Sequence, residues 1–309
     1  MLKVEQVSKK YGNKTVLNKI SFNLKKGDCF GLLGSNGAGK STTIRIILGI
    51  LNKSDGKVTY NDKEVSRKSV NFGYLPEERG LYPKTKVIDQ LLYFAALKNM
   101  PKDKALKEIN ELAKILKIEE YLNMEAEKLS KGNQQKVQIL IAFQNDPELI
   151  ILDEPFSGLD PVNSLLVADL IKKKKKDKII VLSSHQMSIV EEFCTDILIL
   201  DRGITKLKGN LINIKNEYSD SKLEVITIKN IDEKIKKAKL DIINKVGSSY
   251  TLSIKNKDDA YKLLKLLDDN DQVIKFEILK PNLNDIFIST VGGKENVSKA
   301  SHCATRLRL

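Results

Sequence analysis

One run of nine residues limits more than any other feature what this chain can fold into: Gly34-Ser35-Asn36-Gly37-Ala38-Gly39-Lys40-Ser41-Thr42. It fits G-x-x-x-x-G-K-[ST], in which glycines let backbone N–H groups turn inward around phosphates. An apolar stretch, Asp28–Leu33, leads into it, and Ser41–Ile50 continues with helical character. We therefore expect a buried strand, a phosphate loop and a helix, with Lys40 reaching the β- and γ-phosphates and Ser41 offering a hydroxyl to Mg²⁺.

A second apolar stretch ends in two acids. Leu149-Ile150-Ile151-Leu152 runs directly into Asp153 and Glu154, as a buried strand delivering carboxylates to its end. In this position Asp153 is expected on the magnesium side of the phosphate site. Glu154, next along, is expected to polarise an attacking water as general base.

The order of apolar patterns along the chain predicts its organisation. Short apolar stretches separated by helical ones predict an α/β core with a mixed sheet over residues 1 to about 215. A helical block, about 80–147, is inserted between two core strands. From 216 to 292 the pattern reads β-α-β-β-α-β, a small α+β domain, and 293–309 lacks periodicity, so we expect a disordered tail.

Composition excludes several classes of protein. Hydrophobic residues make up 41% and charged residues 30%, which is ordinary for a globular chain. No apolar run approaches the roughly 18 residues that span a bilayer, and no signal-peptide pattern opens the chain. We expect a cytoplasmic protein whose membrane role, if it has one, comes through a partner. The cysteines lack metal-ligand spacing.

The net charge of +13 raises the question of nucleic-acid binding. Arginine occurs at only six positions, so 47 of the 53 basic residues are lysines. Proteins that recognise bases and phosphates usually use the bidentate guanidinium group of arginine, whereas these lysines are spread through many segments. Direct nucleic-acid binding is therefore not expected.

A third motif identifies a family. Ser130 and Gly132, in Leu129-Ser130-Lys131-Gly132-Asn133-Gln134-Gln135, open a helix about 20 residues before Asp153 and 90 after Lys40. The motif resembles the signature of ATP-binding-cassette (ABC) ATPases, P-loop NTPases with a mixed-sheet core and an inserted helical subdomain. Three further features resemble elements of this family. Ser157-Gly158-Leu159-Asp160 resembles the D-loop, with Asp160 as its acid. His185 resembles the switch histidine, and Tyr11 resembles the aromatic residue that stacks on adenine.

The resemblance implies an ATPase that works as a homodimer with ATP and Mg²⁺. Signature residues of one copy, Ser130, Lys131, Gly132, Asn133 and Gln134, would close on the γ-phosphate held by Lys40 of the other. Hydrolysis by Glu154, with His185 sensing the γ-phosphate, would let the copies part. The helical block would pass this motion to an integral membrane permease on a separate chain, which would hold the ATPase at the inner face of the cell membrane.

Two positions depart from the family pattern. Lys131 stands where many members have glycine, and Asn133-Gln134-Gln135 where one glutamine is usual. Glu77, in Gly73-Tyr74-Leu75-Pro76-Glu77, stands where a glutamine normally serves Mg²⁺ and the water. A carboxylate can ligate magnesium but cannot donate a hydrogen bond, so Glu77 is expected as a metal ligand only.

Details of the motifs point to a branch of the family. Leu75–Pro83, the signature region and Lys280–Phe287 resemble ABC-2 type exporters, with closest likeness to the ATPase subunits of sodium exporters. Antibiotic-export and self-immunity ATPases share much of this pattern and remain an alternative. A second class, soluble cassette ATPases acting on ribosomes or DNA, fits less well, because this chain has one cassette and no long coiled-coil insertion. The C-terminal domain either binds a regulatory ligand or widens the dimer interface.

Overall fold

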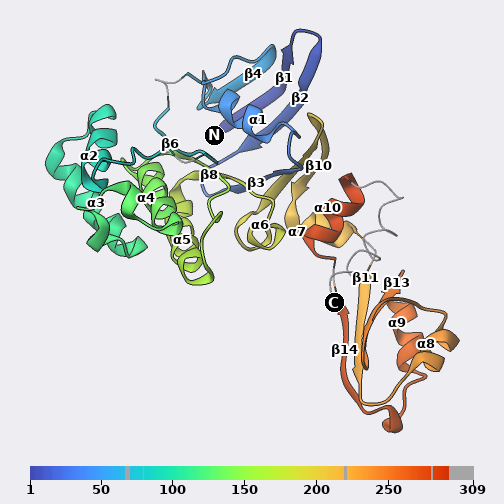
Figure 1. The fold of residues 1–309 in the computed structure, drawn as a ribbon. Helices are drawn as coiled ribbons and strands as arrows, with labels where there is room; N and C mark the ends of the chain where they lie inside the picture. Colours follow the sequence, from blue (N-terminus) through green and yellow to red (C-terminus); the bar gives the residue numbers. More distant parts are fainter. Residues whose placement is uncertain (67–69, 79, 219–220, 280, 292–309) are drawn as a thin grey trace. The chain divides into compact units, whose positions relative to one another are not determined.

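The computed structural model describes residues 1–66, 70–78, 80–218, 221–279 and 281–291, and its ribbon is drawn in Figure 1. The chain divides into two compact units, Met1–Lys208 and Gly209–Leu309, which are described separately below. In the described ranges, no helix is both long enough and apolar enough to cross a membrane.

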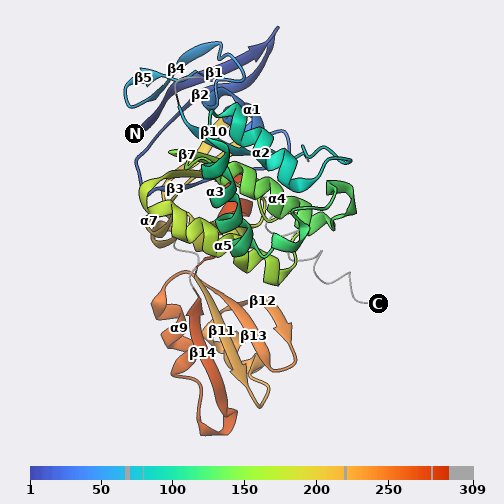
Figure 2. The ribbon, with the colours of Figure 1, turned by 90° about the vertical axis from the view of Figure 1, so that its left-hand side faces the viewer.

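An antiparallel sheet opens the first unit. Leu2 and Val4 are buried on β1 while Glu5 is exposed, as the alternation predicts, and the register shift between Val4 and Val7 brings Val7 into the core as well. The strands pair in the order β2-β1-β4-β5, and Figure 2 shows them at the top of the unit. Their bounds are β1 (Leu2–Tyr11), β2 (Lys14–Leu24), β4 (Asp55–Tyr60) and β5 (Lys63–Glu64).

A six-stranded sheet forms the centre of this unit, in the order β10-β9-β3-β8-β7-β6. Every residue of β3, β7 and β8 is buried, which explains their nearly unbroken apolar sequences. These three strands are parallel neighbours, so their carboxyl ends meet at one edge of the sheet. The bounds are β3 (Cys29–Gly34), β6 (Phe72–Leu75), β7 (Leu149–Asp153), β8 (Ile179–Ser183), β9 (Asp196–Asp201) and β10 (Ile204–Asn210).

Helices cover the sheet and form the inserted block. In Figure 1, α2, α3 and α4 gather beside β6, the edge strand, and α4 packs against β6 and β7. The expected helical block, about 80–147, corresponds to these three helices and their connections. The helices are α1 (Lys40–Ile47), α2 (Val87–Leu97), α3 (Lys102–Leu116), α4 (Lys131–Phe143), α5 (Pro161–Lys174) and α6 (Met187–Phe193), with 3₁₀ turns at Glu119–Tyr121, Ala126–Lys128 and Lys175–Asp177.

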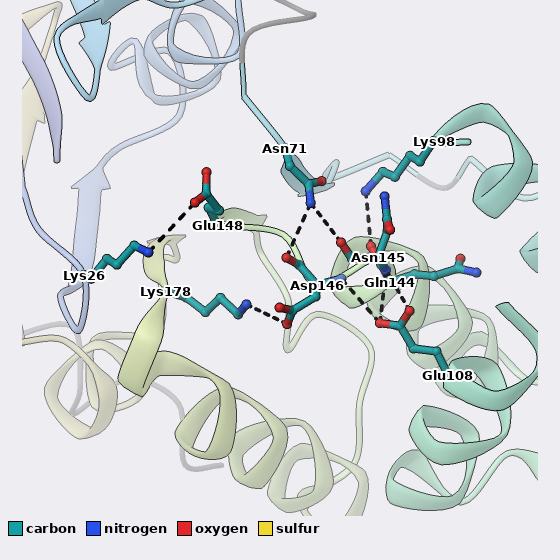
Figure 3. A network of polar contacts seen from close by, with 9 residues as sticks. All are labelled: Lys26, Asn71, Lys98, Glu108, Gln144, Asn145, Asp146, Glu148 and Lys178. Atoms are coloured by element: carbon teal, nitrogen blue, oxygen red, sulfur yellow. Dashed lines mark hydrogen bonds and ion pairs between the residues drawn. The ribbon is translucent and has the colours of Figure 1, made fainter. Parts of the chain in front are cut away.

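The tight turn between α4 and β7 joins the helical block to the sheet (Figure 3). Asn145 and Asp146 both have positive φ, 70° and 44°, so the chain makes a tight left-handed turn after α4. The carboxylate of Glu108 on α3 accepts hydrogen bonds from both N–H groups, at 3.1 Å from Asn145 and 3.4 Å from Asp146. Lys178, just before β8, donates to Asp146 Oδ1 at 2.6 Å.

Lys98, directly after α2, reaches the same junction (Figure 3). Its ammonium donates to the carbonyl oxygens of Phe72 (3.1 Å) and Gln144 (3.3 Å). Burial of the ammonium lowers the pKa of Lys98, with the charge of Glu108 opposing that shift. Side chains that follow α2, lie on α3 and precede β8 therefore fix the C-terminal end of α4.

The second unit contains the expected β-α-β-β-α-β order. Its four strands pair antiparallel in the order β12-β13-β11-β14. Tyr250 and Leu223 lie in its separate apolar core, together with residues of the two helices inside this β-α-β-β-α-β order, α8 and α9. The elements are α7 (Leu211–Glu217), β11 (Ser221–Thr227), α8 (Asp232–Ala238), β12 (Asp241–Val246), β13 (Ser249–Ile254), α9 (Lys257–Leu264), β14 (Val273–Leu279) and α10 (Leu283–Val291), with a 3₁₀ turn at Asp269–Asp271.

The boundary between the units differs from the expected position near 215. The chain divides between Lys208 and Gly209, so α7 belongs to the second unit. Asn210 begins this helix by accepting from the N–H groups of Ile212 and Asn213, and Tyr218 shares a 2.9 Å hydrogen bond with Thr290 of α10. Local contacts of this short helix thus lie with the second unit. The tail expected at 293–309 lies outside the described residues.

Candidate active site

The glycine loop leaves β3 and enters α1 as expected. Gly34 has φ 155°, and a side chain there would place Cβ 2.5 Å from the carbonyl oxygen of Leu200 and 2.8 Å from Ala38 Cβ. Gly39, which precedes α1, has φ 108°, and its Cβ would lie 2.5 Å from Leu17 Cδ2. The backbone path of the loop therefore requires glycine at both positions.

The charged and hydroxyl groups of the loop lie at the start of α1. Lys40 Nζ donates to the carbonyl oxygens of Gly34 (2.7 Å) and Ser35 (3.2 Å), so its ammonium lies over the loop. Lys40, Ser41 and Thr42 are half-buried in the first turn, whereas Ser35, Asn36 and Gly37 are exposed. N–H groups of a helix start carry partial positive charge, and this arrangement suits a polyphosphate.

Asp153 ends β7 beside the loop. Ser183, its register partner on β8, donates to Asp153 Oδ1 at 2.6 Å, and Ser41 donates to Oδ2 at 3.4 Å. Burial raises the pKa of this carboxyl, opposed by the Ser183 hydrogen bond and reinforced by the charges of Glu77 and Glu154. The structure thus brings Ser41 and Asp153 together, as expected.

Glu154 follows in a left-handed backbone conformation with φ 50°. Its side chain is only 10% exposed. The two residues that follow β8 donate hydrogen bonds to the carboxylate: His185 N–H to Oε1 at 2.9 Å and Ser184 Oγ to Oε2 at 3.3 Å. His185 Nδ1 lies 2.8 Å from the same Oε1, and its side chain is 68% exposed. A buried carboxylate aimed at an accessible imidazole can accept a proton from water and share it.

Ser183 and Ser184 were not assigned a role from the sequence. Both are buried at the end of β8, and each hydroxyl holds one of the two acids. A sequence signal for this role exists: Ser183 and Ser184 directly follow one apolar stretch, as Asp153 and Glu154 end another. Because β7 and β8 are parallel neighbours, the residues at their carboxyl ends meet at the same sheet edge.

Glu77 is exposed in the segment after β6, and its charge contributes to the raised pKa of Asp153. Within the described part of the chain, no three His, Cys, Asp or Glu side chains gather closely enough to hold a metal ion. Ser41 Oγ and Asp153 Oδ2 lie 3.4 Å apart at the start of α1, and hard oxygen donors of this kind fit Mg²⁺.

The signature residues begin α4. Ser130 is exposed and accepts from the N–H of Asn133 at 3.3 Å, an ordinary helix N-cap. Lys131 is exposed, Gly132 and Asn133 are half-buried, and Gln134 donates to the carbonyl oxygens of Ala126 (2.9 Å) and Leu129 (3.2 Å). Ser130 and Lys131 at the start of α4 are thus exposed, while Gln134 in the same turn is hydrogen-bonded to its own chain.

Two predicted residues lie on the surface. Asp160 caps α5, accepting from the N–H of Asn163 at 2.9 Å, and these hydrogen bonds lower the pKa of its carboxyl. Tyr11 ends β1, is 52% exposed, and has the ammonium of Lys9 4.8 Å from its ring centroid. Tyr11 therefore presents an aromatic surface that is accessible to a stacking partner.

Comparison with protein families gives three matches. A profile described as "ABC transporter" matches residues 17–157, and one described as "ATP-binding protein DrrA1-3-like, C-terminal domain" matches residues 209–291. A profile described as "phosphotransferase system, EIIB" matches 286–309, of which 292–309 lie outside the described residues.

Comparison with individual proteins gives relatives over nearly the whole chain. "Uncharacterized ABC transporter ATP-binding protein YhaQ" of Bacillus subtilis is 41% identical, over 94% of this chain and 99% of the relative. "Linearmycin resistance ATP-binding protein LnrL" of the same organism is 29% identical, over 94% and 98%. Among solved structures, the dimeric ATP-binding cassette MJ0796 bound to ADP and Pi has TM-score 0.62 and 25% identity, over 68% of this chain and 99% of that chain.

Proposed function

This chain belongs to the family of ABC transporter ATP-binding proteins, and on that premise we propose that it hydrolyses ATP to energise export, with Na⁺ as cargo, through a separate ABC-2 type membrane permease. Hydrolysis of ATP is the activity of this family. The observation that carries its assignment to particular residues is the Glu154 carboxylate, held against His185 at the sheet edge where the glycine loop begins.

The loop residues bind the phosphates in this proposal. Backbone N–H groups of Gly34, Ser35, Asn36, Gly37, Ala38 and Gly39 surround the β-phosphate, with Ser41 and Thr42 at the helix start. Lys40 exchanges its hydrogen bonds with the Gly34 and Ser35 carbonyls for phosphate oxygens. Tyr11, exposed at the end of β1, stacks on the adenine.

Ser41 and Asp153 hold Mg²⁺, and Glu77 supports it from the exposed segment after β6. When bound, the ion neutralises charge on the β- and γ-phosphates. The raised pKa of Asp153 agrees with this assignment, because a buried carboxylate without a cation beside it is disfavoured in its charged form.

Glu154 takes a proton from the attacking water. The N–H of His185 and the hydroxyl of Ser184 fix its two oxygens, so the carboxylate needs no reorganisation at the moment of reaction. His185, whose imidazole is exposed, contacts the γ-phosphate and reports its presence.

Two copies complete two sites. Ser130, Lys131, Gly132, Asn133 and Gln134 of one copy close on the γ-phosphate bound by the other, and Asp160 lies at the contact between copies. The exposed N-terminal surface of α4 supports this, since its cap and first turn are accessible to a second chain. The permease then receives the closing motion from the helical block and holds the ATPase at the cytoplasmic face of the membrane.

An antibiotic is the second candidate cargo. The relative LnrL, whose name states linearmycin resistance, aligns over 94% of this chain, including the second unit. The ATPase chemistry is the same under both cargoes, and the residues of the site favour neither.

The test of the proposed chemistry uses Glu154→Gln. Removal of the carboxylate should lower the rate of ATP hydrolysis by at least about 100-fold while ATP still binds, because a general base contributes about 10²–10⁴-fold. Size-exclusion chromatography with saturating ATP should then show a stable dimer. A variant that hydrolyses ATP like wild type, or that stays monomeric, would contradict the assignment.

The cargo is decided with the complete transporter. The chain and its permease are reconstituted in vesicles, and ATP-driven movement of ²²Na⁺ is compared with that of a labelled peptide antibiotic. Movement of Na⁺ that Glu154→Gln abolishes supports the first cargo. Movement of the antibiotic alone would replace it with the second.

A further inference from the structure

Gln135 on α4 makes a contact that the proposed chemistry does not use. Its side chain is buried, with 6% of the residue exposed, and its Nε2 points at the segment that follows β7. It donates to the carbonyl oxygen of Pro155 at 3.2 Å and lies 3.5 Å from that of Glu154. The side chain of one helix therefore satisfies the backbone of the segment that carries the catalytic carboxylate.

That segment needs support. Glu154 has φ 50°, a left-handed conformation that disfavours a residue with a long side chain. Pro155 has no N–H, so this segment cannot continue the pairing of β7. Glu154 N–H donates to the Ser183 carbonyl at 3.0 Å, and Ser157 N–H donates to the Glu154 carbonyl at 3.1 Å. Gln135 supplies a further restraint from a different element, against the outer side of the turn.

The same helix begins with the signature. Ser130 caps α4 five residues before Gln135, and a methyl group at Gly132 would lie 3.5 Å from the carbonyl oxygen of Gly158. The first turn of α4 thus lies against Gly158, and its second turn binds the Glu154–Pro155 peptide through Gln135. The first two turns of α4 therefore lie along the segment that leads from Glu154 toward Asp160.

We propose that Gln135 is a positioning residue for Glu154: its amide holds the left-handed turn in which the carboxylate meets His185, and it links the signature end of α4 to the catalytic acid of the same chain. The inference rests on the proposed role of Glu154. A shift of α4 when its N-terminus engages a second copy is transmitted to the carboxylate through this hydrogen bond. In the described part of the chain, the hydrogen bonds of the Gln135 side chain run to the carbonyl oxygens of Pro155 and Glu154, and none runs to the glycine loop.

The decisive variant is Gln135→Met in the purified full-length chain. Methionine keeps the length and burial of the side chain but donates no hydrogen bond. The expected result is a kcat for MgATP lowered about 10–100-fold with KM within twofold, because misplacement of a catalytic group by about 1 Å costs rate near 10²-fold. Affinity for a fluorescent ATP analogue should be unchanged.

The matched control is Gln138→Met on the same helix. Gln138 is buried to the same degree, at 5% exposed, and its Oε1 has no hydrogen-bond partner in the described part of the chain. Its replacement should leave kcat within twofold of wild type. If Gln135→Met and Gln138→Met lower kcat equally, Gln135 is only a packing residue and the proposal is overturned.

Two further measurements separate the possible failures. If Gln135→Met does not fold, Gln135→Leu also removes the donor with an apolar side chain, and it should lose kcat as strongly. Gln135→Met added to Glu154→Gln should cause no further loss, since both act through one carboxylate. Additive losses would overturn the positioning role alone, whereas a fully active Glu154→Gln would overturn the proposed base.

Discussion

At the scale of single residues, Asp153 and Asp146 lie in opposite electrostatic situations. Burial raises the pKa of Asp153 above its ordinary 3.8, while the hydrogen bond from Lys178 lowers the pKa of Asp146. The stability from a group with a raised folded pKa is full below its unfolded pKa and is lost as the pH rises through the folded value. Charged Asp153 therefore destabilises the nucleotide-free fold at neutral pH, and charged Asp146 stabilises it.

Asp153→Asn should accordingly raise the thermal midpoint of the nucleotide-free protein at pH 7 by about 2–4 °C, the shift that about 1 kcal/mol gives a domain of this size. The amide oxygen can still accept from Ser183. The difference between variant and wild type should shrink as the pH falls toward 3.8. Calorimetry in EDTA measures both.

Asp146→Asn is the control of opposite sign. Its stability contribution is present above the unfolded pKa and is lost as the pH falls through the lowered folded value, so the variant should melt below wild type at pH 7. If Asp153→Asn also melts below wild type, burial of its charge does not cost the fold.

At the scale of elements, the α4–β7 turn depends on one carboxylate from α3. Glu108→Ala removes the acceptor of the Asn145 and Asp146 N–H groups. Asn145 is half-buried, and the loss of its partner costs about 1–3 kcal/mol, whereas water can replace the partner of the exposed Asp146 N–H. Urea unfolding should show a lower midpoint with an unchanged m-value. Glu111→Ala, an exposed position on the same helix, should stay within about 0.5 kcal/mol of wild type. Equal effects of the two variants would mean that the turn does not need Glu108.

Elements differ in how well the sequence predicts them. β3 and β7 were found because a strand buried on both faces must be apolar throughout, and the glycine loop because its backbone path admits few residues. The contact of Gln135 with Pro155 could not be predicted, because it depends on the rotation of α4 about its axis against a segment 20 residues away. The sequence does not predict the short α7, since its two buried residues, Leu211 and Ile214, form too little of a period to distinguish a helix from a loop.

At the scale of the whole molecule, the two units have separate apolar cores. One core includes Leu2, Phe30 and Leu200, and the other Leu223, Tyr250 and Leu263. A ligand stabilises only the structure that binds it, by about 2.7 kcal/mol at 100 times its Kd. ATP in EDTA, which prevents hydrolysis, should therefore raise the unfolding transition of Met1–Lys208 and leave that of the second unit unchanged.

Hydrogen exchange followed by mass spectrometry, with and without ATP, assigns each transition to its unit. Peptides of β3 and β7 should gain protection, and peptides of β11 and β13 should not. A single transition that moves as a whole would show that the two cores unfold as one cooperative structure.

The separate cores also determine how changes to this chain combine. Because the residues given for the two cores do not overlap, a substitution in one core removes no contact within the other, and free-energy changes at distant sites with no shared partners add. Two separate unfolding transitions would therefore allow a variant of the second unit to be combined with a variant of Met1–Lys208, with a total free-energy change equal to the sum of the two.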